Sequence, residues 1–504
     1  MMAPIFKKIL LDGDATSGDT RGCTIVVAAS NSIDPTLAPV AYRCDGTDDQ
    51  VEINAAITAL GATGGTVMLL EGQYNITASI NLATLTTLMG QGAGTVLRIP
   101  DGFDDDLNVI SAVSVNRVIV ADLRIDGNRA NQAAGNMNGI YFETVTYSTI
   151  ARCWVENVYD SSGTGGIWLS NSDYNIILGN ICQDNYSIGI FLDGSSNNTI
   201  VGNICQGNED EAGIVLEDYD VGPCEGNTIL GNVCNGNYDG IWIYYSSNNI
   251  VSGNICEGNL GVGITLAGGN CNNNTVTGNN CRSNSYAGIA LAGYLYNNTV
   301  TGNNCSNNGA YGIWLINTCN HNTITGNTCQ GNAYSGIWLI NTCNHNTITG
   351  NTVVGNSQAT DNTYDGIFID DNSDYNNVQG NTVRHAGGAN QHRYGIRINS
   401  ADCDGNLVIN NDLYLAGRTA NLNDAGTGTI VRSNRGWATE NSGTSTGTGA
   451  QETIPHGLNV IPNRVQLTDL EVGASPYQSA APDATNIYTT AVLNQDYLWK
   501  AWKV

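Results

Sequence analysis

A repeat of about 24 residues runs through the middle of the chain and limits its possible folds. The dipeptide Gly-Ile opens a unit ten times between Gly166 and Gly395, with successive starts 23 to 30 residues apart. Residues 312–328 and 336–352 are identical. Each unit has short alternating apolar stretches broken by Gly and Asn, without helical periodicity. This pattern predicts an all-β chain whose units are the coils of a parallel β-helix, right-handed as parallel crossovers normally are.

Because coils stack about 4.8 Å apart, each repeat position should become a column along the molecule. Two such columns contain only asparagine. Stacked amides can bond to each other and to turn backbone, and asparagine tolerates the left-handed backbone of tight corners. The columns are Asn180, Asn203, Asn232, Asn254, Asn279, Asn303, Asn327, Asn351, Asn381 and Asn411, and Asn175, Asn198, Asn227, Asn249, Asn274, Asn298, Asn322, Asn346, Asn376 and Asn406.

Twelve of the fifteen cysteines also fall into two columns, where they alternate with valine or serine. Such positions predict small buried side chains, so we expect free core thiols, with disulfides between coils or a metal site as alternatives. Cys23 and Cys44 lie outside these columns and form the most plausible disulfide. The columns are Cys182, Cys205, Cys234, Cys256, Cys281, Cys305 and Cys329, and Cys224, Cys271, Cys319, Cys343 and Cys403.

The segment before the repeats predicts a short helix that caps the open end of the β-helix. Thr47 and Gln50 are spaced as a capping box, and Val51, Ile53, Ile57 and Leu60 would form the apolar side of the helix. A cap is expected because an open β-helix end exposes sheet edges.

The motifs around this helix, D-G-T-D-D, A-I, G-G-T-V and G-x-Y, resemble the entry of the pectate-lyase-like β-helix superfamily, especially its tailspike and lyase members. The resemblance covers roughly residues 40–435. The segment 446–462 is similar to terminal modules of phage tail proteins. The resulting domain prediction is an N-terminal arm (1–21), a capping segment (22–65), a β-helix (66–435), a flexible linker (436–449) and a small C-terminal β-sandwich (450–504).

Composition narrows the possible partners. The net charge is −26, from 45 acidic and 19 basic residues. Such a surface repels phosphate backbones and anionic lipid, which argues against nucleic-acid and membrane partners. No apolar run is long enough to span a membrane, and the N-terminus lacks the apolar core of a signal peptide. Neutral sugars and Ca²⁺ remain compatible with this charge, and no cofactor or metal is required.

In the unit G-I-x-[LI]-x, the third and fifth positions should point outward from the coil. Six of the ten third positions are aromatic. A row of exposed rings predicts either stacking on a polysaccharide or coverage by loops or neighbouring chains. The candidate substrate-binding residues are Trp168, Phe191, Trp242, Trp314, Trp338 and Phe368, with Tyr244 from the fifth position.

Two groups of polar residues are candidates for catalysis. Asp193 and Glu217 share the fifth-position column in adjacent coils, about 5 Å apart, which raises one pKa and suits a retaining glycosidase. The same pair could hold Ca²⁺ with Asp218 or Asp220. Both acids could equally be solvated charges.

The second group lies in the two longest coils, and Asp370, Asp371, His392 and Arg397 are its candidate catalytic residues. The whole group consists of Asp365, Asp370, Asp371, Arg384, His385, His392, Arg393, Tyr394 and Arg397. These residues suit acid/base work or binding of an anionic sugar, or they are solvated loop charges. Polygalacturonases of the superfamily carry N-T-D, D-D, H-G and R-I-K motifs. Asp370-Asp371 and Arg397-Ile-Asn resemble two of these, while N-T-D and H-G are absent. His321 and His345 repeat in register and are predicted to be structural.

Two functions therefore follow. The first is a tailspike-like, extracellular or virion-associated protein that binds a polysaccharide and can depolymerise it as a lyase or glycoside hydrolase. The second is a non-catalytic surface component that uses the β-helix as a rigid spacer. The resemblance to tailspikes implies a homotrimer.

Overall fold

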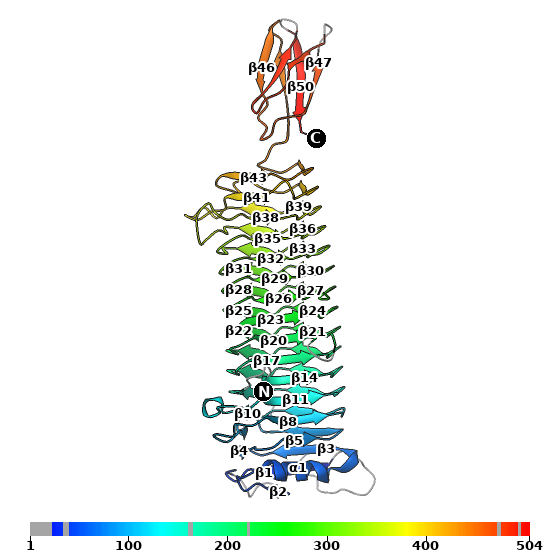
Figure 1. The fold of residues 1–504 in the computed structure, drawn as a ribbon, viewed down its shortest axis with the longest axis vertical. Helices are drawn as coiled ribbons and strands as arrows, with labels where there is room; N and C mark the ends of the chain where they lie inside the picture. Colours follow the sequence, from blue (N-terminus) through cyan, green and yellow to red (C-terminus); the bar gives the residue numbers. More distant parts are fainter. Residues whose placement is uncertain are drawn as a thin grey trace, which may run out of the picture.

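The computed structural model describes residues 23–33, 40–159, 165–218, 222–470, 475–491 and 495–503. The predicted N-terminal arm lies outside these residues. The chain forms one tall stack of coils with a small β domain at its C-terminal end (Figure 1). The fold is therefore the predicted parallel β-helix with a single capping α-helix among the described residues.

Each coil contributes strands to three parallel sheets, which we call sheets A, B and C. Sheet A has 17 strands, from β1 (Cys23–Ala28) to β44 (Ile430–Arg432), and sheet B has 13, from β4 (Gly72–Asn75) to β40 (Thr382–Arg384). Sheet C has 14 strands: β5 (Ile80–Leu82), β8 (Leu107–Val113), β11 (Met137–Glu143), β14 (Gly165–Ser170), β17 (Ile188–Asp193), β20 (Ala212–Glu217), β23 (Asp239–Tyr244), β26 (Ile264–Ala267), β29 (Ile289–Ala292), β32 (Ile313–Ile316), β35 (Ile337–Ile340), β38 (Ile367–Ile369), β41 (Tyr394–Ile398) and β43 (Ala420–Asp424).

The repeat position must be glycine because the coil has no room there for a side chain. A Cβ placed on Gly312 would lie 2.5 Å from the carbonyl oxygen of Gly336 and 2.8 Å from the Cβ of Cys329. The isoleucine after each glycine and the apolar residue two positions later fill the coil, where they join one continuous apolar core. The alternation of the repeat thus fixes which side chains of sheet C point outward.

Asparagine side chains bond the corners of successive coils. In a typical rung, the backbone N–H of Asn303 donates to Oδ1 of Asn327 at 2.9 Å, and its Nδ2 donates to the carbonyl of Val276. A third asparagine column, which we did not predict, lies at the corner between sheets B and C. It consists of Asn185, Asn208, Asn237, Asn259, Asn284, Asn308, Asn332 and Asn356, and His392 accepts the last bond.

All fifteen cysteines are free thiols, and only Cys23 is exposed. The predicted disulfide between Cys23 and Cys44 is wrong. Strand β1 pairs in parallel with β2 (Tyr42–Arg43) so that Ala28 faces Arg43. Cys44 thus lies beside the end of β1, and Cys23 lies at its start, about 20 Å away at ~3.3 Å per residue. A disulfide needs Cα atoms within about 7 Å.

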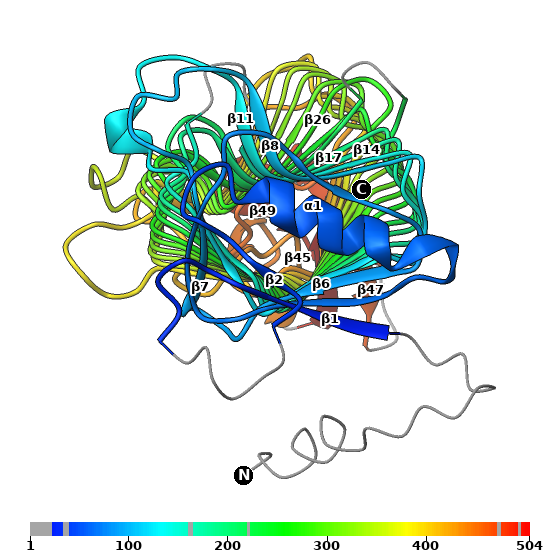
Figure 2. The same ribbon diagram turned by 90° about the horizontal axis from the view of Figure 1, so that it is seen from below.

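Helix α1 (Gln50–Ala59) lies across the lower end of the stack (Figure 2). Its N-cap is Asp49, without a side-chain capping bond, so the predicted capping box of Thr47 and Gln50 is wrong. The carboxylate of Asp49 instead accepts bonds from the amides of Gly46 and Asn75, which fastens the helix to the first coil. Ile53 and Ile57 are buried as predicted, whereas Val51 is 59% exposed.

The C-terminal domain consists of two three-stranded antiparallel sheets that share an apolar cluster around Ile487 and Trp499. The prediction of a flexible linker over 436–449 is wrong for residues 440–446. These residues form β45 (Glu440–Thr446), which pairs along its whole length with β50 (Asp496–Trp502). Backbone pairing makes the Ser/Thr-rich segment a strand although its side chains are small.

Among the described residues, no helix is long and apolar enough to cross a membrane.

Candidate functional site

The third positions of the repeats form the predicted column on the outer face of sheet C, and neighbouring coils keep them in register. The column is less exposed than predicted. Phe191 is only 5% exposed, and Val215 and Ala290 are buried, while Trp168, Trp242, Trp314, Trp338 and Phe368 are half-buried. The reason is that residues just before each repeat glycine also point outward and cover the column.

These covering residues divide the column into two clusters. The lower aromatic cluster packs Trp168, Phe191 and Trp242 against Ile188, Ala212 and Val215. The upper aromatic cluster packs Trp314 and Trp338 against Tyr311, Tyr334, Val262, Ala287 and Ala310.

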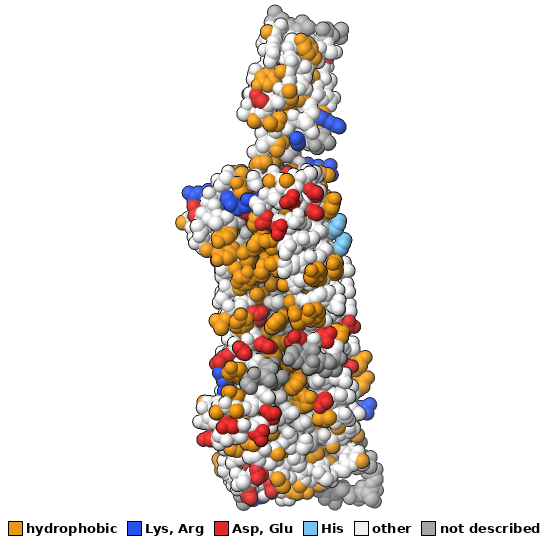
Figure 3. Space-filling model, in the orientation of Figure 1, with side chains coloured by type: hydrophobic (Ala, Val, Ile, Leu, Met, Phe, Trp, Pro, Cys, Tyr) orange, Lys and Arg blue, Asp and Glu red, His pale blue; other side chains and the backbone are white. Residues whose placement is uncertain are grey.

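The upper aromatic cluster continues into Phe368 on the next coil. Trp314 and Trp338 stack with ring centroids 6.1 Å apart, and Trp338 and Phe368 stack at 5.8 Å. A contiguous hydrophobic patch lies in the upper half of the face presented by sheet C (Figure 3). We did not predict the tyrosines, although Tyr286, Tyr311, Tyr334 and Tyr364 each stand one or two residues before a repeat glycine.

Arg397 ends the aromatic column on β41. Its guanidinium lies 5.1 Å from the ring centroid of Phe368 and 5.7 Å from that of Tyr394. The nearest carboxylate, that of buried Asp365, is 3.6 Å away and already accepts two bonds from Arg393. The side chain of Arg397 makes no hydrogen bond with a described residue, its Nε is buried, and the side chain is 21% exposed. The donors of the guanidinium other than Nε can therefore bind a ligand.

The predicted carboxylate pair lies on the same face, several coils lower. Asp193 and Glu217 are direct neighbours on β17 and β20, and Tyr244 follows on β23. Asp193 is only 3% exposed. Burial, together with the charges of Asp193 and Asp218, raises the pKa of Glu217 above its ordinary value. Asp220, a predicted Ca²⁺ ligand, lies outside the described residues.

The second predicted group comes together only in part: Asp365 forms ion pairs with Arg393 and Arg397, whereas no ion pair among the described residues links Asp370 or Asp371 to Arg397. His392 is fully buried; its Nε2 accepts the amide of Asn356 at 2.8 Å, and its Nδ1 lies 3.1 Å from the carbonyl of Ala416. A catalytic role for His392 is therefore wrong, because both ring nitrogens serve the corner of the coil. Asp370 accepts a bond from Asn399, and Asp371 occupies a left-handed turn at φ 46°. The ion pair of Arg397 is with Asp365 instead.

The family model described as "Periplasmic copper-binding protein (NosD)" matches residues 107–220 and 212–364, which together are more than half of the chain. The chain belongs to the NosD family. No curated protein matches its sequence. The match covers the middle coils, including both aromatic clusters and the pair of Asp193 and Glu217.

Solved structures similar to this NosD-family chain are β-helices at low sequence identity. A mutant tailspike of E. coli bacteriophage HK620 in complex with a pentasaccharide is 14% identical over 95% of this chain and 94% of that one, with a TM-score of 0.54. Tailspike protein 3 of bacteriophage CBA120 is 13% identical over 77% and 59%, at 0.50. The A-module of a mannuronan C-5 epimerase from Azotobacter vinelandii is 19% identical over 77% and 94%, at 0.43.

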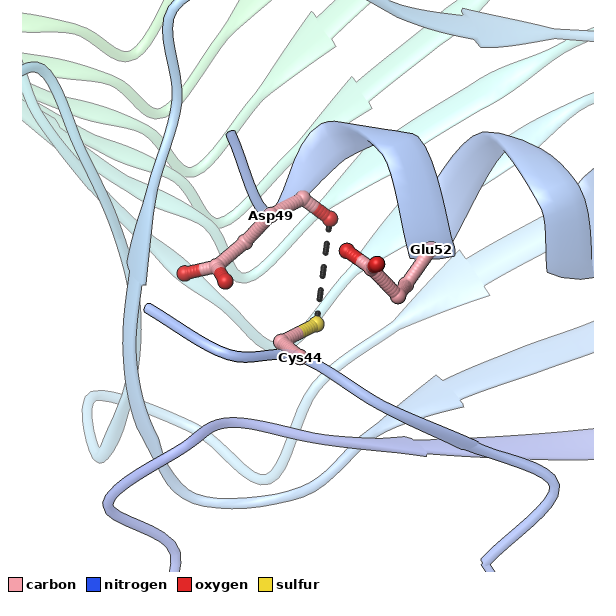
Figure 4. Close-up of side chains that lie close together, drawn as sticks. All are labelled: Cys44, Asp49 and Glu52. Carbon is pink, nitrogen blue, oxygen red and sulfur yellow. Dashed lines mark hydrogen bonds between the residues drawn. The ribbon is translucent and has the colours of Figure 1, made fainter. Parts of the chain in front are cut away.

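The family description raises the question of copper, which binds thiolate, thioether or imidazole ligands. The cysteine columns do not fit, because they are sealed in the core and burial raises the pKa of thiols such as Cys224 and Cys271 to about 12. Cys44, Asp49 and Glu52 lie close together at the N-terminal end of α1, where Asp49 is the N-cap and Glu52 belongs to the first turn (Figure 4). That group offers one buried thiol and two hard carboxylates, a poor donor set for copper.

The five histidines, all within the described residues, differ in how many of their ring nitrogens make hydrogen bonds. His392 and His456 are buried, with both ring nitrogens engaged, and Nδ1 of His385 accepts the amide of Gly387. His321 and His345 are exposed and spend neither ring nitrogen on a described residue. Ring nitrogens without a described hydrogen-bond partner therefore remain on this pair and on His385.

Proposed function

We propose that the protein binds polysaccharide along the outer face of sheet C, with the upper aromatic cluster and Phe368 as the main contact surface. The observation that carries the proposal is the half-buried ring column of Trp314, Trp338 and Phe368. The column ends at the partly exposed guanidinium of Arg397, which makes an ion pair with Asp365 but no side-chain hydrogen bond. Aromatic rings supply apolar contact to sugar rings, and a guanidinium can bind a hydroxyl or a carboxylate of the same chain.

The likeness to a tailspike solved with a pentasaccharide supports the proposal at the level of fold. The family description and the tailspike likeness also support a location outside the cytoplasm, in the periplasm, the extracellular space or a virion. The acidic chain disfavours nucleic acid as a partner. A homotrimer and a requirement for Ca²⁺ remain proposals from the sequence.

The binding proposal predicts that Trp338→Ala weakens binding to a responsive polysaccharide about tenfold or more, which corresponds to ~1.4 kcal/mol. Binding is measured by quenching of tryptophan fluorescence after screening a polysaccharide panel. Melting temperature should also fall, because Trp338 packs against Tyr311 in the upper aromatic cluster.

The matched control is Trp154→Ala, which removes a half-buried outward tryptophan on β13 (Trp154–Glu156) of sheet B. Both indoles have a buried Nε1 without a hydrogen-bond partner, so a similar loss of stability is expected. Binding should survive in Trp154→Ala. Equal binding in both variants would contradict the proposed surface, and a panel without any binding polysaccharide would favour the rigid spacer.

Cleavage is a second candidate function, favoured by the adjacency of Asp193 and Glu217. We propose Glu217 as the general acid, because its raised pKa keeps more of it protonated near neutral pH. Activity should fall as the pH rises through that pKa, since the proton to be donated is then lost.

Glu217→Gln should reduce the release of reducing ends by about 10²–10⁴-fold, the usual contribution of a general acid. Glu257→Gln on β25 (Ile255–Glu257) of sheet B is the control and should keep full activity. A wild-type protein that binds polysaccharide but releases no reducing ends would leave the binding proposal standing and remove cleavage.

A further inference from the structure

We propose that the outer face of sheet A binds ice through a regular array of threonine side chains. Strands β27 (Thr275–Thr277), β30 (Thr299–Thr301), β33 (Thr323–Thr325) and β36 (Thr347–Thr349) each consist of two outward threonines around a buried valine or isoleucine. We call the outward residues the threonine face: Thr275, Thr277, Thr299, Thr301, Thr323, Thr325, Thr347 and Thr349. The proposed polysaccharide surface lies on sheet C, so this inference does not rest on it.

The four coils of the threonine face repeat with nearly the same geometry. Their strands pair in register, threonine beside threonine. In each coil the amide of the first threonine donates to the carbonyl of a corner asparagine in the neighbouring coil at 2.9 Å. The glycine after the second threonine has φ between 62° and 64° in every coil. Two buried asparagine columns flank the face, so the array is held rigidly from both sides.

The spacing of the hydroxyl groups suits an ordered layer of water. Neighbouring coils lie ~4.8 Å apart, and the two threonines of one strand lie ~6.7 Å apart. These intervals are close to the repeat distances of oxygen atoms on the prism plane of hexagonal ice. The hydroxyl of Thr349 donates to that of Thr325 at 3.2 Å, and the other hydroxyls of the face make no hydrogen bond with a described residue. Each can donate one bond and accept two, and a β-branched side chain has few χ1 rotamers.

The surroundings of the threonine face favour ice over other partners. From β12 (Thr149–Ala151) to β42 (Leu407–Ile409), the strands of sheet A contain no charged residue, although the net charge of the chain is −26. The strands of the threonine face also lack the aromatic rings that sheet C offers to a sugar. A dry apolar partner would leave the hydroxyls without hydrogen bonds, which costs free energy, whereas ice satisfies them through water. The extended loops of the upper coils project away from β30 and β33 (Figure 1).

The test measures thermal hysteresis of the full chain, which is the gap between the melting and freezing temperatures of an ice crystal in the protein solution. We expect wild type to open such a gap and to shape the crystal into facets. Thr301→Lys lies in the middle of the threonine face. It should reduce the gap about twofold or more, because a long charged side chain holds the neighbouring coils away from the ice. Its melting temperature should barely change, as for other surface substitutions.

A second measurement follows adsorption to ice directly, with a fluorescent label on Cys23, the one exposed thiol. The matched control is Thr328→Lys, which changes a half-buried outward threonine on β34 (Thr328–Gln330) of sheet B. This control should keep the gap and the adsorption, and Thr301→Lys should lose most of both.

A wild-type chain that neither opens a gap nor adsorbs to ice would overturn the proposal, as would equal losses in the two lysine variants. Light scattering supplies a further check. If wild type forms an oligomer that Thr301→Lys dissociates and Thr328→Lys does not, the threonine face binds a second copy of the chain and the proposal is wrong.

Discussion

Asn303→Ala is expected to destabilise the solenoid by about 2–4 kcal/mol. Oδ1 of Asn303 accepts from the backbone N–H and from Nδ2 of Asn279, and Nδ2 of Asn303 donates to the carbonyl of Val276 and to Oδ1 of Asn327. Alanine removes all four bonds inside a buried corner. Each buried group left without a partner costs about 1–3 kcal/mol, and at least two are orphaned. Thermal and urea unfolding measure the loss.

The adjacent residue supplies the control. Asn304 points outward on sheet B, is half-buried, and donates to Oδ1 of Asn280. Asn304→Ala should change stability by about 0.5 kcal/mol or less, as surface substitutions usually do. Equal losses in the two variants would show that the asparagine columns contribute no more than ordinary surface amides.

The fold could be predicted because one repeat fixes three things at once. Its alternation determines which side chains point inward and which point outward. Its glycine marks the position where neighbouring coils leave no room for a side chain, and its asparagines mark the corners between the sheets. Predictions failed where contacts between distant segments decide the structure. Asp49 is held by Asn75 rather than by its own helix, and residues 440–446 become a strand through pairing with β50. Neither partner can be identified from local sequence.

The sequence predicts which residues of the candidate site lie side by side in neighbouring coils, but it does not predict how exposed their side chains are. The third-position column and the neighbouring acids Asp193 and Glu217 follow directly from the repeat. The covering of Phe191 by Ile188 and Ala212 does not, because these residues lie where the strand departs from regular alternation. His392 is the clearest failure. An extended coil with His and Arg suggested chemistry, but the histidine replaces an asparagine at the end of a buried column.

Because a histidine replaces the asparagine there, we expect the upper coils to lose stability as the pH falls. Nε2 of His392 accepts the amide of Asn356, so the folded state needs the neutral ring, and burial lowers the pKa of His392 to about 4 from an ordinary 6.5. Well above pH 6.5 the ring is neutral in the folded and in the unfolded state, and His392 then costs no free energy of unfolding. As the pH falls from 6.5 toward 4, the unfolded chain binds a proton that the folded chain does not. The loss in the free energy of unfolding approaches about 3 kcal/mol near pH 4 and does not grow at lower pH.

Comparison with His392→Gln isolates this contribution from the other titrating groups. A glutamine amide oxygen can accept from Asn356 at every pH, so the variant has no ring to protonate. At pH 7.5 wild type should be the more stable, because its Nδ1 also lies in hydrogen-bonding reach of the Ala416 carbonyl. Between pH 6.5 and 4.5 this advantage should shrink by about 2–3 kcal/mol and can reverse. Urea unfolding and hydrogen exchange at the Asn356 amide report it. Parallel pH profiles for the two proteins would mean that His392 titrates alike in the folded and unfolded chains, and that its buried bond to Asn356 does not hold the ring neutral.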